Sequence, residues 1–135
     1  MGNIPLTILY TGLFGLLMAI LSIRVSFARA RADIEFGDGG KPDLTTRIRV
    51  FGNFTEHVPI MLGMFLVLEL AHTRPLLLHG LGTGLLLVRI IHAVCLKVES
   101  PPTPWRRMGR FVSALGTWLI LLTMSLLLIK PYILR

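Results

Sequence analysis

The chain has 135 residues, enough for a single domain. Hydrophobic residues make up 53% and charged residues 16%, with a mean hydropathy of +0.72, whereas a water-soluble domain has about a quarter charged residues. The net charge of +7 comes from basic residues that flank apolar segments, a pattern typical of membrane loops and not of a phosphate-binding face. The composition therefore indicates a protein that crosses a membrane several times, and it excludes a nucleic-acid partner.

Four apolar segments follow one another along the chain. Each has about the ~20 residues that a helix needs to cross ~30 Å of hydrocarbon, and a helix satisfies its own backbone there. The first segment lacks a basic leader and a small-residue cleavage site, so we expect a retained span and not a signal peptide. The expected spans cover residues 4–23, 51–71, 76–96 and 111–129. The sequence thus predicts one all-α membrane domain over residues 1–135, a bundle of four transmembrane helices.

The basic residues between the spans predict the orientation. The first loop carries Arg24, Arg29, Arg31, Lys41, Arg47 and Arg49, and the second carries Lys97, Arg106, Arg107 and Arg110. The turn between the second and third spans holds only Arg74, and the tails hold Lys130 and Arg135. Because positive residues collect on the cytoplasmic side, both long loops are expected in the cytoplasm and both termini outside.

Polar residues stand where the second span begins. Arg49, Asn53 and Glu56 recur at helical spacing and therefore share one face. A carboxylate at this depth is costly unless it is paired, and it usually faces protein or water and not lipid. Pro59 follows and removes one backbone hydrogen bond. His57 lies one position off the stripe, so we expect it to face either a neighbouring subunit or the loop.

The third span carries a matching pair. Arg89 and His92 are three residues apart and share a face. The second span enters the membrane where the third leaves it, so Arg89 is placed to neutralise Glu56. Two interpretations remain open, a structural ion pair between helices and a functional site.

Other residues have simpler expectations. Glu69 and His72, at the far end of the second span, are expected at the membrane interface. Gly80, Gly82 and Gly84 place small residues on the third span and include a GxxxG pair, which favours close approach of another helix. The single cysteine, Cys95, lies in an apolar run and is expected to be a small core residue. No metal site is predicted.

The spacing Arg49-x-x-x-Asn53-x-x-Glu56-x-x-Pro59, at the start of the second of four spans, resembles the signature of the MAPEG family. These are the membrane-associated proteins of eicosanoid and glutathione metabolism. The four-span layout, the expected outward termini and the length agree with that family over nearly the whole chain. Arg89-x-x-His92 resembles the family's polar pair on the third helix, and Arg110 followed by GTW resembles a recurrent bacterial form.

The resemblance implies a homotrimer of four-helix bundles, with glutathione as co-substrate bound between adjacent subunits near the cytoplasmic side. Arginines grip carboxylates in bidentate fashion, a buried glutamate suits the ammonium, and an asparagine pairs with peptide groups. The glutathione ligands implied in this way are Arg49, Asn53, Glu56, His57, Arg89, His92 and Arg29. Arg29 also fits a plain membrane anchor.

The resemblance also implies an arginine that favours the thiolate of glutathione, because a nearby cation lowers a thiol pKa. Arg107 and Arg110, at the start of the fourth span, are the candidates, and Arg106 is the alternative. The chain departs from several eicosanoid enzymes at Leu96, where they carry a tyrosine, and from some of them at His57. The eicosanoid reactions are therefore not predicted.

We expect a glutathione transferase or peroxidase of the bacterial inner membrane that acts on hydrophobic electrophiles. Its expected partners are other copies of the chain and membrane lipids or hydrophobic small molecules. The alternative is a non-catalytic membrane protein of the same fold that binds a lipid or an anionic metabolite. A proton-coupled transporter ranks last, because the charges cluster at one end of the spans and not at the midplane.

Overall fold

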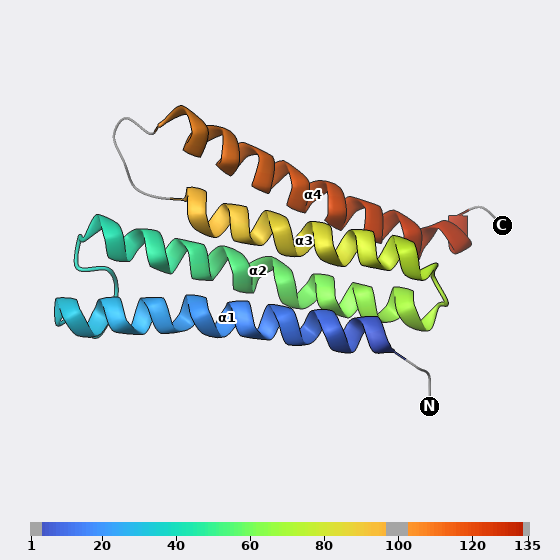
Figure 1. Ribbon diagram of the computed structural model, residues 1–135, viewed down its shortest axis with the longest axis horizontal. Helices are drawn as coiled ribbons and strands as arrows, with labels where there is room; N and C mark the ends of the chain where they lie inside the picture. Colours follow the sequence, from blue (N-terminus) through green and yellow to red (C-terminus); the bar gives the residue numbers. More distant parts are fainter. Residues whose placement is uncertain (1–3, 97–102, 134–135) are drawn as a thin grey trace.

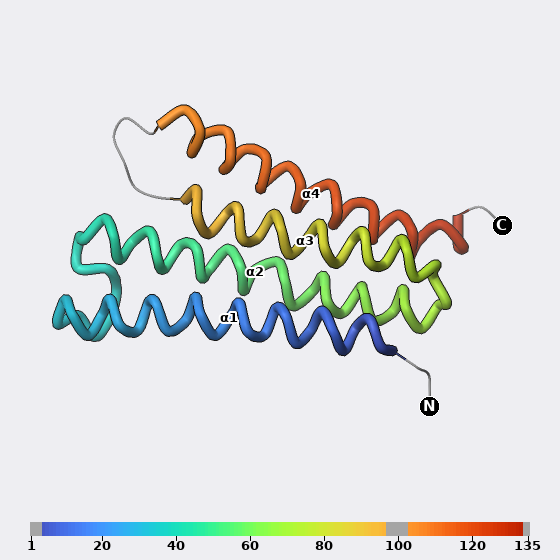
Figure 2. Tube along the Cα trace, in the orientation of Figure 1, coloured from blue at the N-terminus to red at the C-terminus, as the bar shows by residue number. Residues whose placement is uncertain are grey.

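The computed structural model describes residues 4–96 and 103–133, which form four long helices in an up-and-down bundle (Figure 1). The helices are α1 (Pro5–Ala32), α2 (Pro42–Leu70), α3 (Pro75–Cys95) and α4 (Pro104–Ile133). All four are long and apolar enough to cross a membrane. The tube in Figure 2 shows α4 inclined relative to the other three. The expected all-α fold with four spans is confirmed.

Each of the four helices starts at a proline. Proline fits the first turn because the N–H groups there have no partner within the helix, and its fixed φ is already helical. The helices α1, α2 and α4 are longer than the expected spans, with 28, 29 and 30 residues. At 1.5 Å per residue this is ~42–45 Å, against ~30 Å of hydrocarbon.

The extra length lies mostly at one end of the bundle, where α1 and α3 end and α2 and α4 begin. We call this the loop end, and the opposite end the turn end. Most basic residues expected in loops therefore lie on helices: Arg24, Arg29, Arg31, Arg47, Arg49, Arg106, Arg107 and Arg110. Lys97 lies outside the described residues.

The connection between α1 and α2, residues 33–41, is a tight turn. Gly37, Gly39 and Gly40 all have positive φ, which glycine adopts without steric cost. Asp38 accepts hydrogen bonds from the Thr45 hydroxyl at 2.7 Å and from the Gly40 N–H at 3.0 Å. These hydrogen bonds, the Thr45 hydroxyl first, hold the pKa of Asp38 below its usual value. The side chains of the turn thus stabilise its start and its exit into α2.

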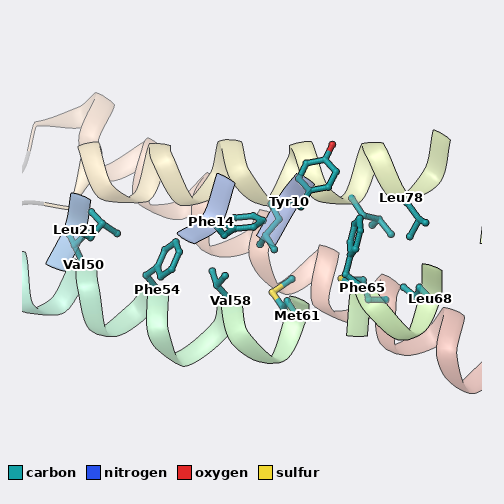
Figure 3. Close-up of a cluster of buried hydrophobic side chains, with 13 residues drawn as sticks. Tyr10, Phe14, Leu21, Val50, Phe54, Val58, Met61, Phe65, Leu68 and Leu78 are labelled. Atoms are coloured by element: carbon teal, nitrogen blue, oxygen red, sulfur yellow. The ribbon is translucent and has the colours of Figure 1, made fainter. Parts of the chain in front are cut away.

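The hydrophobic core lies along the seam where α1, α2 and α3 meet (Figure 3). Its labelled members are Tyr10, Phe14 and Leu21 of α1, Val50, Phe54, Val58, Met61, Phe65 and Leu68 of α2, and Leu78 of α3. The rings of Tyr10 and Phe65 pack edge to face with centroids 5.4 Å apart, a geometry that aromatic pairs prefer. This core fixes α1 against α2 and α3.

The contact between α1 and α3 depends on a glycine. A Cβ on Gly82 would lie 2.6 Å from the Tyr10 ring, so only glycine lets that ring lie against α3. The Tyr10 hydroxyl is 2.8 Å from the Thr83 hydroxyl and 3.1 Å from the backbone oxygen of His79. A Cβ on Gly80 would touch nothing. A Cβ on Gly84 would lie 3.4 Å from the Ile120 side chain of α4. Of the three glycines expected to allow close helix approach, Gly82 is therefore the one that the contact of α1 with α3 requires.

Glu69 has a structural role that the sequence did not indicate. Its carboxylate accepts the backbone N–H groups of Leu6 at 2.9 Å and Thr7 at 2.6 Å, and the residue is buried. The first N–H groups of a helix lack internal partners and carry partial positive charge, so a carboxylate stabilises them. Glu69 lies at the end of α2, as expected, but it is buried against the start of α1. Cys95 is a buried free thiol, as expected.

Candidate functional site

The polar stripe of α2 lies in the half of the bundle nearer the loop end. Arg49 and Glu56 are exposed, whereas Asn53 and His57 are half-buried. Within the described part of the protomer, neither the Arg49 nor the Glu56 side chain has a hydrogen-bond or ion-pair partner. These two opposite charges are therefore free to contact a ligand or another subunit.

The stripe is joined to α3 through a backbone carbonyl. The oxygen of Asn53 accepts a hydrogen bond from Nη1 of Arg89 at 3.1 Å, and Nδ1 of His57 lies 3.0 Å from it. The Asn53 amide itself donates to the backbone oxygen of Arg49 at 3.1 Å. The His57 ring therefore hydrogen-bonds to its own helix.

Arg89 is a buried cation of α3. Its side chain is 4% exposed, and its Nη2 donates to the Thr117 hydroxyl of α4. Its Nε has no partner. No acidic side chain of the described residues pairs with it. A guanidinium buried in this way lowers the stability of the fold unless a negative charge neutralises it.

The expected ion pair between Glu56 and Arg89 is thus absent from the protomer. Arg89 approaches α2 at the inward-facing backbone of Asn53, while Glu56 lies on the exposed surface of the same helix. The sequence placed both residues at a similar depth, but depth does not say which way a side chain points.

A chain of hydroxyls on α4 completes the cluster. The Thr117 hydroxyl donates to the Ser113 backbone at 2.8 Å, and the Ser113 hydroxyl donates to the Arg110 backbone at 3.0 Å. Nδ1 of His92 is 3.3 Å from the Ser113 oxygen. The Ser113 hydroxyl can donate to the Arg110 carbonyl and accept from Nδ1 of His92 at the same time. Nε2 of His92 is buried without a hydrogen-bond partner among the described residues.

Ser113 and Thr117 were not singled out in the sequence. Their signal was available: they are small polar residues four positions apart in an apolar span, so they share one face of α4. Both are almost completely buried. They hold Arg89 and His92 in place, and thus belong to the candidate site.

The remaining predicted residues lie apart from the stripe within the protomer. Nη1 of Arg29 donates to the backbone oxygen of Glu35 at 3.1 Å, and this hydrogen bond stabilises the turn after α1. Arg107 and Arg110 are exposed on the first turns of α4. The structure therefore brings together Asn53, His57, Arg89 and His92 and presents Arg49 and Glu56 beside them.

The arrangement suits a ligand that carries both charges and an amide. An exposed guanidinium and carboxylate on α2 can pair with an anion and a cation. Behind them, Nε of Arg89 and Nε2 of His92 are buried without a hydrogen-bond partner among the described residues, and buried polar atoms of this kind are normally satisfied.

The chain is similar to known proteins over almost its whole length. It matches the MAPEG family over residues 7–130. Two curated relatives, both called inner membrane protein YecN, come from Escherichia coli strain K12 and from E. coli O6:H1 strain CFT073. Each is 32% identical over 120 residues, which cover 86% of this chain and 87% of the relative. No solved structure matches the chain.

Proposed function

Since the chain belongs to the MAPEG family, we propose that it is a multi-pass inner membrane protein that binds glutathione and transfers it to hydrophobic electrophiles. Its relatives are named as inner membrane proteins, and its four helices have the required length and apolarity. The observation that carries the proposal is the unpaired Arg49 and Glu56 on the exposed face of α2.

Glu56 in particular supports a second subunit. It lies five residues beyond Phe51, where the apolar part of α2 begins, and this places it ~8 Å inside that segment. An ionised carboxylate facing lipid at such a depth is costly. A homotrimer, in which a neighbour covers the stripe and the ligand lies between them, removes that exposure.

Each part of glutathione has a complementary group. Arg49 binds a carboxylate through two parallel hydrogen bonds, and Glu56 binds the ammonium. The Asn53 amide and Nε2 of His92 face the peptide groups. A second carboxylate supplies the counter-charge that Arg89 lacks. Arg29 donates to the backbone of Glu35 in its own chain, and in this proposal it reaches the ligand across the subunit boundary.

The chemistry is nucleophilic attack by sulfur. Arg107 or Arg110 stabilises the thiolate, and the thiol proton leaves to water. The sulfur then forms a bond to the electrophilic carbon of a molecule dissolved in the bilayer, and the leaving group departs with the electron pair. The exposed apolar surface of the helices allows such a molecule to approach from the lipid.

Calorimetric titration of the detergent-solubilised protein with glutathione tests the proposal. We expect saturable heat with glutathione and none with an analogue that lacks both carboxylates, because Arg49 and Arg89 then lose their partners. An absence of heat with glutathione contradicts the proposal.

A second candidate function is non-catalytic binding by the same fold. It is favoured by Leu96 and His57, which stand where related enzymes carry tyrosine hydroxyls. Incubation with glutathione and 1-chloro-2,4-dinitrobenzene separates the two candidates. Formation of the thioether supports the transferase, and glutathione binding without any product supports the alternative.

A further inference from the structure

A second group of basic residues lies away from the α2 stripe, inside one protomer at the loop end. They line a pocket of about 340 Å³ to which all four helices contribute. Arg24 of α1, Arg47 of α2 and Arg106 of α4 form its basic wall. Its apolar wall includes Leu21, Val50 and Leu96. Arg47 and Arg49 are two residues apart, so their side chains point about 200° apart around the helix. The pocket therefore opens on a different side of α2 from the stripe.

A neighbouring pocket extends this basic surface between α1 and α2. It measures about 440 Å³ and shares Arg24, Asp43 and Arg47 with the first. It adds Arg31 and Lys41, together with the apolar side chains of Ile23 and Phe27. The two pockets therefore form one continuous depression, which we call the loop-end pocket.

Basic side chains outnumber acidic ones among the described residues that line the loop-end pocket. Arg24, Arg31, Lys41 and Arg47 line it together with one described carboxylate, that of Asp43. Asp43 pairs with Nε of Arg47 at 2.8 Å, so it leaves the other nitrogens of that guanidinium available. Such a concentration of positive charge in a concave site attracts anions.

We propose that the loop-end pocket binds a phosphate ester, presented either by an anionic lipid headgroup or by a soluble molecule. Phosphate oxygens accept several charge-assisted hydrogen bonds, and the arginine fork matches their geometry. Arg24 directly follows the first expected span, which places the pocket at the depth of lipid headgroups. Ile23 and Phe27 provide the apolar surface that an acyl chain or a glycerol carbon requires.

The test measures binding to the purified full chain in detergent, with three probes: dioctanoyl-phosphatidylglycerol, dioctanoyl-phosphatidylcholine and glycerol phosphate. We expect saturable binding of phosphatidylglycerol. Arg24→Gln should weaken it about fivefold or more, the scale for one basic residue near a lipid headgroup. Asp43→Asn should strengthen it, because the negative charge is lost and the Arg47 fork is freed. Arg74→Gln, an exposed arginine at the turn end, is the matched control and should change nothing.

The outcomes separate the two sources of phosphate. Binding of phosphatidylglycerol alone supports the lipid headgroup, and equal binding of glycerol phosphate supports a soluble ester. The proposal is overturned if neither phosphatidylglycerol nor glycerol phosphate binds, or if wild type, Arg24→Gln and Asp43→Asn bind with equal affinity. Glutathione titration of the same variants should match wild type, which keeps this site distinct from the α2 stripe.

Discussion

Two glutamates on the same helix have opposite environments. Glu56 is exposed and has no partner among the residues that the structure describes, whereas Glu69 is buried and accepts two backbone N–H groups of α1. They are thirteen residues apart, so they point in different directions around α2. The sequence showed both carboxylates. It could not show that the first turn of α1 lies against Glu69, because that neighbour is set by the tertiary fold.

This contrast gives a paired prediction. Glu69→Gln should lower the free energy of unfolding by about 1–3 kcal/mol, because the charge that stabilises the start of α1 is lost. Glu56→Gln should leave thermal stability unchanged and abolish glutathione binding, because its charge serves only the ligand. Thermal melting and calorimetric titration of both variants check this. A destabilised Glu56→Gln protein with normal affinity would mean that Glu56 is a structural residue.

Substitution of Arg89 gives a second test of a single residue. A buried charge without a counter-charge costs stability, and an apolar residue of similar size is often neutral or stabilising in its place. Arg89→Met should therefore melt at the same temperature as wild type or higher, and its glutathione affinity should fall by roughly 2–4 kcal/mol. A large drop in melting temperature would show instead that the hydrogen bonds to Asn53 and Thr117 hold the bundle together.

At the scale of whole helices, the four apolar segments were sufficient to predict the number and order of the spans. Their ends were not predictable, because apolarity marks only the part of a helix that lies in hydrocarbon. α2 begins at Pro42, nine residues before its expected span. Those residues are polar enough for water, yet they continue the same helix. Arg49 therefore lies on the same helix as Glu56. Because the helix is continuous between them, their spacing in the sequence places both side chains on one face.

The packing of α1 on α3 predicts the effect on stability of adding one methyl group at Gly82. A Cβ at Gly82 would lie 2.6 Å from the Tyr10 ring, so Gly82→Ala should force the helices apart and cost about 1–3 kcal/mol. Gly80→Ala is the control, because a Cβ there touches nothing in the protomer. Chemical denaturation in detergent measures both. Equal stability of the two variants would contradict the close contact at Gly82.

For the molecule as a whole, the distribution of basic residues predicts that the loop end faces the cytoplasm. The orientation can be read from cysteine labelling in a Cys95→Ser background. A cysteine at Phe36, which is 87% exposed in the turn after α1, should react only after the membrane is permeabilised. A cysteine at Arg74, in the opposite turn, should react in intact cells. The reverse pattern would invert the topology.

The central claim is that the exposed charges of α2 form a glutathione site covered by a neighbouring subunit. Native mass spectrometry of the protein released from detergent, with glutathione present, tests assembly and binding together. We expect a trimer that carries up to three glutathione molecules, and an unliganded trimer for Glu56→Gln. A wild-type protein that appears only as a monomer, or as a trimer without bound glutathione, would contradict it.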